Sequence, residues 1–133
     1  MCELRSRIGG LWVLNNDNGL SAACDSLHVN SENKVSAYKD FLFPDSARIY
    51  PDHVQMAQYP EAYADRFGLR SHIRFRSRVK AGEPLPGLRW TVLLADGTRT
   101  RFDAVVGASG HQGVPSHPPF SQDFSGEYLH SHD

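Results

Sequence analysis

Residues 90–110, WTVLLADGTRTRFDAVVGASG, carry the clearest fold signal in the chain. Trp90, Val92 and Leu94 alternate with less apolar residues, which predicts a half-buried strand. Asp96-Gly97 followed by the second strand-forming run 98–102 predicts a hairpin. The run AVVGASG at 104–110 is short, apolar and ends at a glycine, which predicts a fully buried strand of a parallel sheet.

A further alternation precedes this stretch, because four less polar residues alternate with four cations. The less polar set is Ile73, Phe75, Ser77 and Val79, and the cations are Arg74, Arg76, Arg78 and Lys80. The pattern predicts another strand, so that 72–110 holds a strand, an antiparallel meander and the buried strand. A basic face could follow a nucleic-acid backbone, but a charged face of this kind is usually a solvated strand edge. No nucleic-acid partner is expected.

A helix is predicted over 52–68. Asp52 is a suitable N-cap, and Gly68 supplies the stop. The apolar face recurs at helical spacing through Met56, Tyr59, Tyr63 and Phe67. Pro60 lies inside this pattern, where it costs about 3 kcal/mol. We therefore expect a kink or a later helix start.

Residues 1–51 carry little periodicity, and a long irregular stretch inside a domain is usually functional. A chain of 133 residues has the length of one domain. Its formal net charge of −1 gives no strong electrostatic attraction to polyanions. There is no run of 18 apolar residues and no signal peptide, so no membrane partner is expected. Two cysteines make no disulfide framework, which favours a cytoplasmic location.

Three kinds of site are weakly supported. The four histidines His111, His117, His130 and His132, with Asp133, have no spacing typical of a metal site, so no metal is expected. The nucleophile-elbow pattern of hydrolases is absent, since the serine at 109 lacks the required glycine spacing. Nothing near Cys24 would activate its thiol.

Two glycine turns lie about a hundred residues apart, and each flanks the helix and meander. The first is Gly9-Gly10-Leu11-Trp12, and the second is Ala108-Ser109-Gly110. Glycine lets a backbone approach a cofactor closely, and an acid such as Glu3 can bind a ribose hydroxyl. Together the turns favour a cofactor site.

Five ordered segments resemble the class B flavin-containing monooxygenases. They are GGLW after Glu3, SLHVNSENKVSAYKDFLFP, YADRFGLRSHIRF, FDAVVGASGHQGVPSHP and FSGEYLHSHD, and they span nearly the whole chain. The last segment fits the family motif F-x-G-x-x-x-H at Phe124, Gly126 and His130. Five ordered matches are far more specific than one glycine motif.

The resemblance implies an α/β class: a partial FAD-binding, two-dinucleotide-binding-domain flavoprotein fold with an inserted three-stranded antiparallel β-meander. The family's N-terminal Rossmann βαβ start, with its G-x-G-x-x-G turn, is expected to be missing. Residues 1–133 would then be a partial FAD-binding domain. Its parts would be flavin-contacting loops at 1–51, the helix at 52–68, the meander region at 72–110, and a connector at 111–133 toward an absent NADPH domain.

The resemblance also implies the site. Glu3 matches the acid on the adenosine ribose, and Asn30 matches the catalytic asparagine beside the flavin and nicotinamide. The remaining cofactor-binding positions implied by the family are Gly9, Gly10, Leu11, Trp12, Val29, Ser31, Gln55, Val79, Ala108, Ser109 and Gly110.

The implied function is that of a fragment of an NADPH- and FAD-dependent monooxygenase. In the family, a hydroperoxyflavin formed from O2 oxygenates a nucleophilic nitrogen or sulfur of a small molecule, and the protein orients the cofactor that carries the electrons. The alternative is a truncated, non-catalytic fragment or interaction module. In either case we expect self-association through exposed sheet edges.

Overall fold

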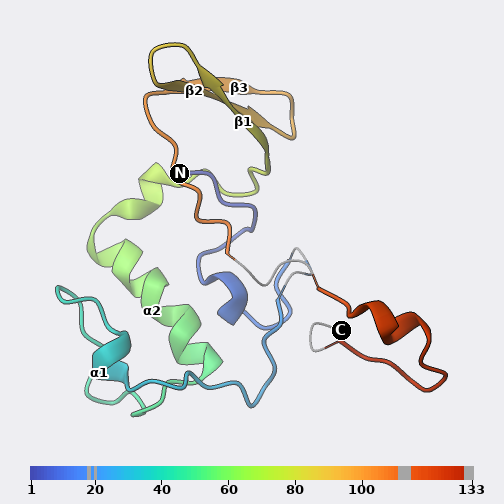
Figure 1. Cartoon of the computed structure of the whole chain (residues 1–133). Coiled ribbons are helices and arrows are strands. Elements are labelled where there is room, and N and C mark those ends of the chain that lie inside the picture. Colours follow the sequence, from blue (N-terminus) through green and yellow to red (C-terminus); the bar gives the residue numbers. More distant parts are fainter. Residues whose placement is uncertain (18, 20, 111–114, 131–133) are drawn as a thin grey trace. The chain divides into compact units, whose positions relative to one another are not determined.

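The computed structural model describes residues 1–17, 19, 21–110 and 115–130 (Figure 1). Its contacts divide the chain into two units. One unit, Met1–Ile8 with Ala64–Ser109, is called here the meander unit, and the other, Gly9–Tyr63 with Gly110–Asp133, the loop unit. The elements in order are η1 (Gly10–Trp12), α1 (Asn33–Ser36), α2 (His53–Arg66), η2 (Leu69–His72), β1 (Val79–Leu85), β2 (Arg89–Leu94), β3 (Arg99–Phe102) and η3 (Pro119–Gln122).

The antiparallel meander is confirmed. β2 lies between β1 and β3, and Trp90 pairs with Phe102 on one side. Val92 and Leu94 are buried, as their alternation predicts. The turn between β2 and β3 depends on Gly97, whose φ of 85° suits glycine, and on Asp96, whose Oδ1 accepts the Thr98 N–H at 2.8 Å.

The first strand of the meander begins later than the sequence predicts. β1 starts at Val79, because Arg76 adopts a φ of +51° that no regular strand contains. It then continues through Pro84, which an edge strand tolerates because the missing N–H faces no neighbour there. The expected strand over 73–80 was therefore wrong in its position, since only its last two residues belong to β1.

Residues 73–77 instead lie beside the N-terminal segment. Arg74 N–H donates to the Met1 carbonyl at 2.8 Å, and Glu3 N–H donates to the Arg74 carbonyl at 2.9 Å. Ser77 N–H donates to the Glu3 carbonyl at 2.8 Å. Cys2 and Arg74 form one isolated parallel bridge. The pairing holds Glu3 in place without making a continuous ladder.

Helix α2 lies inside the range 52–68 expected from the sequence. Asp52 caps it, since Gln55 N–H donates to Asp52 Oδ1 at 2.9 Å. Pro60 lies inside one continuous helix that begins at His53, so a later start was wrong (Figure 1). Gly68 follows in the left-handed conformation, with a φ of 63°, which suits a helix end.

An aromatic cluster attaches the irregular residues 38–43 to α2. Tyr38 N–H donates to Tyr59 Oη at 2.7 Å, and the Tyr59 hydroxyl donates to the Phe41 carbonyl. The rings of Phe43 and Tyr59 stack with centroids 4.1 Å apart, and Tyr63 meets the Tyr38 ring edge-on at 4.8 Å. Ring packing on the helix thus orders a segment that has almost no regular structure of its own.

The buried strand expected over 104–110 is a correction. These residues have no regular secondary structure and are all exposed, with Val106 90% exposed. A buried parallel strand needs hydrogen-bonded neighbours on both sides, and no strand of the described residues pairs with this segment. The prediction of a buried strand was therefore wrong, because apolar composition alone cannot supply the neighbouring strands that such a strand needs.

Candidate functional site

The turn at Gly9 and Gly10 opens the loop unit. Gly9 has a φ of 126°, and a Cβ there would lie 2.6 Å from Val13 Cγ2 and 3.4 Å from the Ala57 carbonyl oxygen on α2. Glycine is therefore required at position 9 by packing as well as by backbone conformation. Leu11 and Trp12 follow in η1, half-buried, and Ser21 Oγ donates to the Leu11 carbonyl at 2.8 Å.

The segment around Asn30 lies beside the start of α2. His53 N–H donates to the Leu27 carbonyl at 2.9 Å, and Val29 N–H donates to the Pro51 carbonyl at 2.9 Å. Pro51 is fully buried beneath this pairing. The Val29 N–H is thus already used within the chain.

The polar side chains near the start of α2 differ in whether they form hydrogen bonds. The Asn30 amide is exposed and has no hydrogen-bond partner among the described residues. Ser31 Oγ lies 2.7 Å from Ser36 Oγ. On the first turn of α2, Gln55 Oε1 is buried and has no partner in the described part of the chain. A buried oxygen without a donor costs about 1–3 kcal/mol, which a bound group with an N–H or O–H would offset.

The other candidate residues belong to the meander unit, apart from Gly110. Glu3 Oε1 accepts the Arg5 N–H at 3.0 Å, so this carboxylate is held in one orientation. Val79 opens β1 next to an irregularity in its pairing with β2. Ala108 and Ser109 are exposed and lie outside any helix or strand.

Three groups in the described part of the chain have shifted pKa values, two on α2 and one in the turn between β2 and β3. Burial, followed by the Asp40 carboxylate, raises the pKa of the Tyr63 hydroxyl. The hydrogen bond from Arg70 lowers the pKa of Asp65, and hydrogen bonds from Thr98 lower the pKa of Asp96. None of these groups belongs to the site implied by the sequence.

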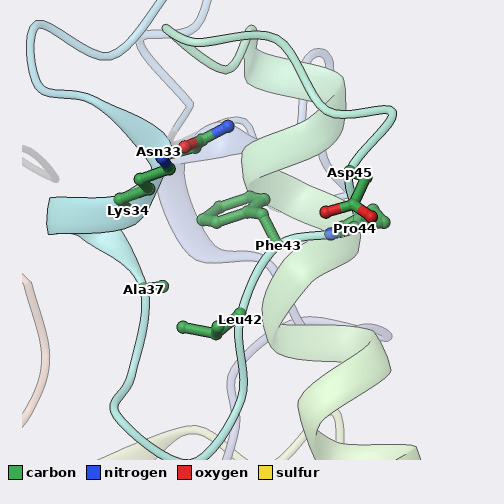
Figure 2. Close-up of a pocket in the computed structure, with 7 residues that line it drawn as sticks. All are labelled: Asn33, Lys34, Ala37, Leu42, Phe43, Pro44 and Asp45. Carbon is green, nitrogen blue, oxygen red and sulfur yellow. The ribbon is translucent and has the colours of Figure 1, made fainter.

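One pocket was missed by the sequence reasoning. It has a volume of about 180 Å³ and lies between α1 and the segment 42–45, with Ala37, Leu42 and Phe43 forming its apolar wall (Figure 2). Lys34 and Asp45 also line it. It contains none of the expected cofactor residues. The only sequence feature that could have indicated this pocket is the apolar run FLFP at 41–44, and that run fits a buried turn equally well.

The C-terminal histidines make contacts of their own. His117 Nδ1 lies 3.2 Å from Tyr128 Oη, and the rings of His117 and His130 meet edge-on at 5.2 Å. A Cβ at Gly126 would lie 2.6 Å from Phe124 Cζ, the end of an exposed ring that could turn away. No metal-binding group of three ligands occurs among the described residues; His111, His132 and Asp133 lie outside them.

The helices over residues 1–17, 19, 21–110 and 115–130 include none that is long and apolar enough to span a bilayer. The expectation of no membrane partner is not tested further by this observation.

Comparison with known proteins covers the whole chain. A family model described as flavin-binding monooxygenase-like matches residues 1–133. A human putative dimethylaniline monooxygenase of the N-oxide-forming type is 32% identical over 98% of this chain and 27% of its own length. The chain therefore spans about a quarter of this curated relative.

Two solved structures show the same fold. The S-allyl-L-cysteine S-oxygenase of Allium sativum superposes with a TM-score of 0.83 at 26% identity, over 98% of this chain and 35% of that one. An oxidised steroid monooxygenase bound to NADP superposes with a TM-score of 0.67 at 26% identity, over 82% of this chain and 20% of that one. One neighbour is titled an S-oxygenase and the other a steroid monooxygenase.

Proposed function

The chain belongs to the flavin-binding monooxygenase-like family, and on this premise we propose that it is a section of an NADPH- and FAD-dependent monooxygenase acting on a nucleophilic nitrogen or sulfur. The human relative is named for N-oxide formation and the Allium sativum neighbour for S-oxygenation. Their products share one chemistry, the addition of one oxygen atom from O2 to a lone pair. The substrate class is therefore a small molecule that carries such a lone pair.

The observation that carries the proposal is the pair of polar side chains at the start of α2. Asn30 presents an amide that has no partner among the described residues, and Gln55 Oε1 is buried without a donor. The backbone pairing of Val29 with Pro51 fixes this arrangement. Exposed and unsatisfied amide groups fit a flavin or nicotinamide ring, both of which carry amide-like donors and acceptors.

The other residues would bind and orient the cofactor. The Glu3 carboxylate, oriented by the Arg5 N–H, would accept a ribose hydroxyl. Leu11 and Trp12 would cover an apolar ring and exclude water from it. Val79 would contribute backbone contacts. When bound, FAD supplies the reaction with O2 and NADPH supplies the electrons.

The proposal extends to the diphosphate of FAD. Residues 1–133 contain no G-x-G-x-x-G sequence, the turn that places a helix N-terminus on a dinucleotide diphosphate. We assign that task to a Rossmann βαβ unit that this sequence does not contain, and the binding of NADPH to a further domain of the same kind. A cytoplasmic location fits the two free cysteines, Cys2 and Cys24.

A flavin titration tests this function. The purified chain is mixed with FAD, and both the flavin fluorescence and the visible absorption spectrum are recorded. Because the diphosphate-binding turn is absent from residues 1–133, we expect weak fluorescence quenching, between micromolar and millimolar FAD. Asn30→Ala should weaken it further, with Gln58→Ala as an exposed control. Absence of binding at millimolar FAD would leave family membership intact but would favour a non-catalytic fragment or interaction module.

A further inference from the structure

The two units carry opposite charge. The meander unit contains eleven arginines and lysines against five acidic residues, a formal net charge of +6. The rest of the chain contains three such cations against ten acidic residues, a net charge of −7. The overall charge of −1 conceals this separation. Each unit therefore attracts the other unit of a second copy.

The tip of the β1–β2 hairpin is the most exposed apolar point of the described chain. Leu88 is 91% exposed and has a φ of +61°, directly after Gly87 at +78°. Two consecutive positive φ values are typical of tight hairpin turns, which favour glycine, asparagine or aspartate. Leucine is an unusual choice at such a position, since both its exposure and its backbone conformation are unfavourable. Arg89 follows it and pairs with no acid among the described residues.

The pocket on the loop unit complements this tip. Its wall of Ala37, Leu42 and Phe43 is apolar, and Leu42 is itself 68% exposed (Figure 2). Its volume of about 180 Å³ exceeds that of a leucine side chain, whose four carbons take roughly four times the ~30 Å³ of a liquid water molecule. Asp45 and Lys34 both line the pocket, and the Asp45 carboxylate can accept hydrogen bonds from a neighbouring guanidinium.

We propose that Leu88 of one copy docks into this pocket of a second copy, with Arg89 beside Asp45 and with the opposite unit charges steering the encounter. The contact is heterologous, because the two copies use different surfaces. Apolar burial of one leucine supplies the specific contact, and the charges raise the rate of association and set its orientation. Surface ion pairs alone would contribute little affinity.

Sedimentation velocity on the whole chain tests the proposal. We expect concentration-dependent oligomers near 0.01 M salt whose fraction falls near 1 M, as the Debye length decreases from about 30 to about 3 Å. Leu88→Asn should weaken association about tenfold or more, the effect of removing one buried leucine. Leu129→Asn, which removes a leucine that is 71% exposed elsewhere, should change nothing.

Mixing two variants gives a sharper result. Leu88→Asn removes the leucine of the tip and Leu42→Lys places a charge in the pocket, so each variant alone should associate about tenfold or more weakly than wild type at low salt. Their equimolar mixture should form a dimer, because one partner keeps its pocket and the other its tip. A wild-type monomer at every salt concentration, association that strengthens with salt, or a mixture that stays monomeric would each overturn the proposal. Circular dichroism of both variants establishes that they fold.

Discussion

At the scale of single residues, Gln55 combines a structural cost with a proposed function. Its backbone N–H belongs to the helix cap, whereas its side-chain Oε1 is buried without a partner among the described residues. Such an atom destabilises the unliganded protein. Residues that break a local rule in this way are often functional, because the binding of a ligand removes the cost.

We expect Gln55→Leu to stabilise the unliganded chain by about 1 kcal/mol, since it replaces an unsatisfied polar group with an apolar one of similar size. The same variant should weaken FAD binding. Urea unfolding and flavin titration measure the two effects, and Gln58→Leu, an exposed position on the same helix, is the control. A less stable variant with unchanged flavin affinity would show that the oxygen is satisfied within the protein.

At the scale of elements, Tyr59 connects α2 to the irregular segment before it. Its hydroxyl serves two backbone groups, the Tyr38 N–H and the Phe41 carbonyl, while its ring stacks on Phe43. A segment with little regular structure must satisfy its backbone groups by other means, and a buried hydroxyl is one of them. The helix and this loop therefore depend on each other.

Tyr59→Phe retains the ring and removes the hydroxyl. We expect a loss of about 1–3 kcal/mol in the free energy of unfolding, because two part-buried backbone groups lose their partner. Tyr50→Phe, at a position that is 51% exposed, should change stability by less than about 0.5 kcal/mol. Chemical denaturation compares them, and equal stabilities for the two variants would contradict the assigned role.

The elements also show what the sequence could predict. The hairpin at Asp96-Gly97 and the alternation of β2 depend on local residue pattern, so both were recovered. The start of β1 was not, because the positive φ of Arg76 is set by backbone bonds to residues 1–5, far away in the sequence. The unpartnered Gln55 oxygen and the pocket beside Phe43 depend on side-chain packing, which no spacing rule contains.

The candidate site, too, could be predicted only in part from the sequence. The family resemblance supplied its residues, including Asn30 and Glu3, because motif order survives in the sequence. It could not predict the contacts that these residues make within the chain. The Val29 N–H is already hydrogen-bonded to the Pro51 carbonyl, and Gly9 is required because a Cβ there would contact Val13 and Ala57. Which atoms remain free for a ligand is decided by the folded backbone.

At the scale of the whole molecule, the chain exposes a strand-forming segment. Residues 104–110 are apolar and accessible, with Val106 90% exposed, and no strand of the described residues pairs with them. Unpaired backbone next to β-branched side chains is a template for pairing with other chains. Self-association through this segment therefore stays a prediction, and it differs physically from the charge-steered docking of Leu88.

The dependence on salt concentration distinguishes the two kinds of association. Docking steered by charge weakens as salt rises, whereas pairing through residues 104–110 uses backbone hydrogen bonds and apolar contacts that salt does not screen. We therefore expect that the aggregates remaining near 1 M salt depend on Val106. Val106→Lys should reduce them severalfold in light scattering, because a charged side chain on an exposed edge opposes pairing. Leu129→Lys adds the same charge outside the segment, so an equal reduction by both variants would attribute the effect to net charge and refute edge pairing.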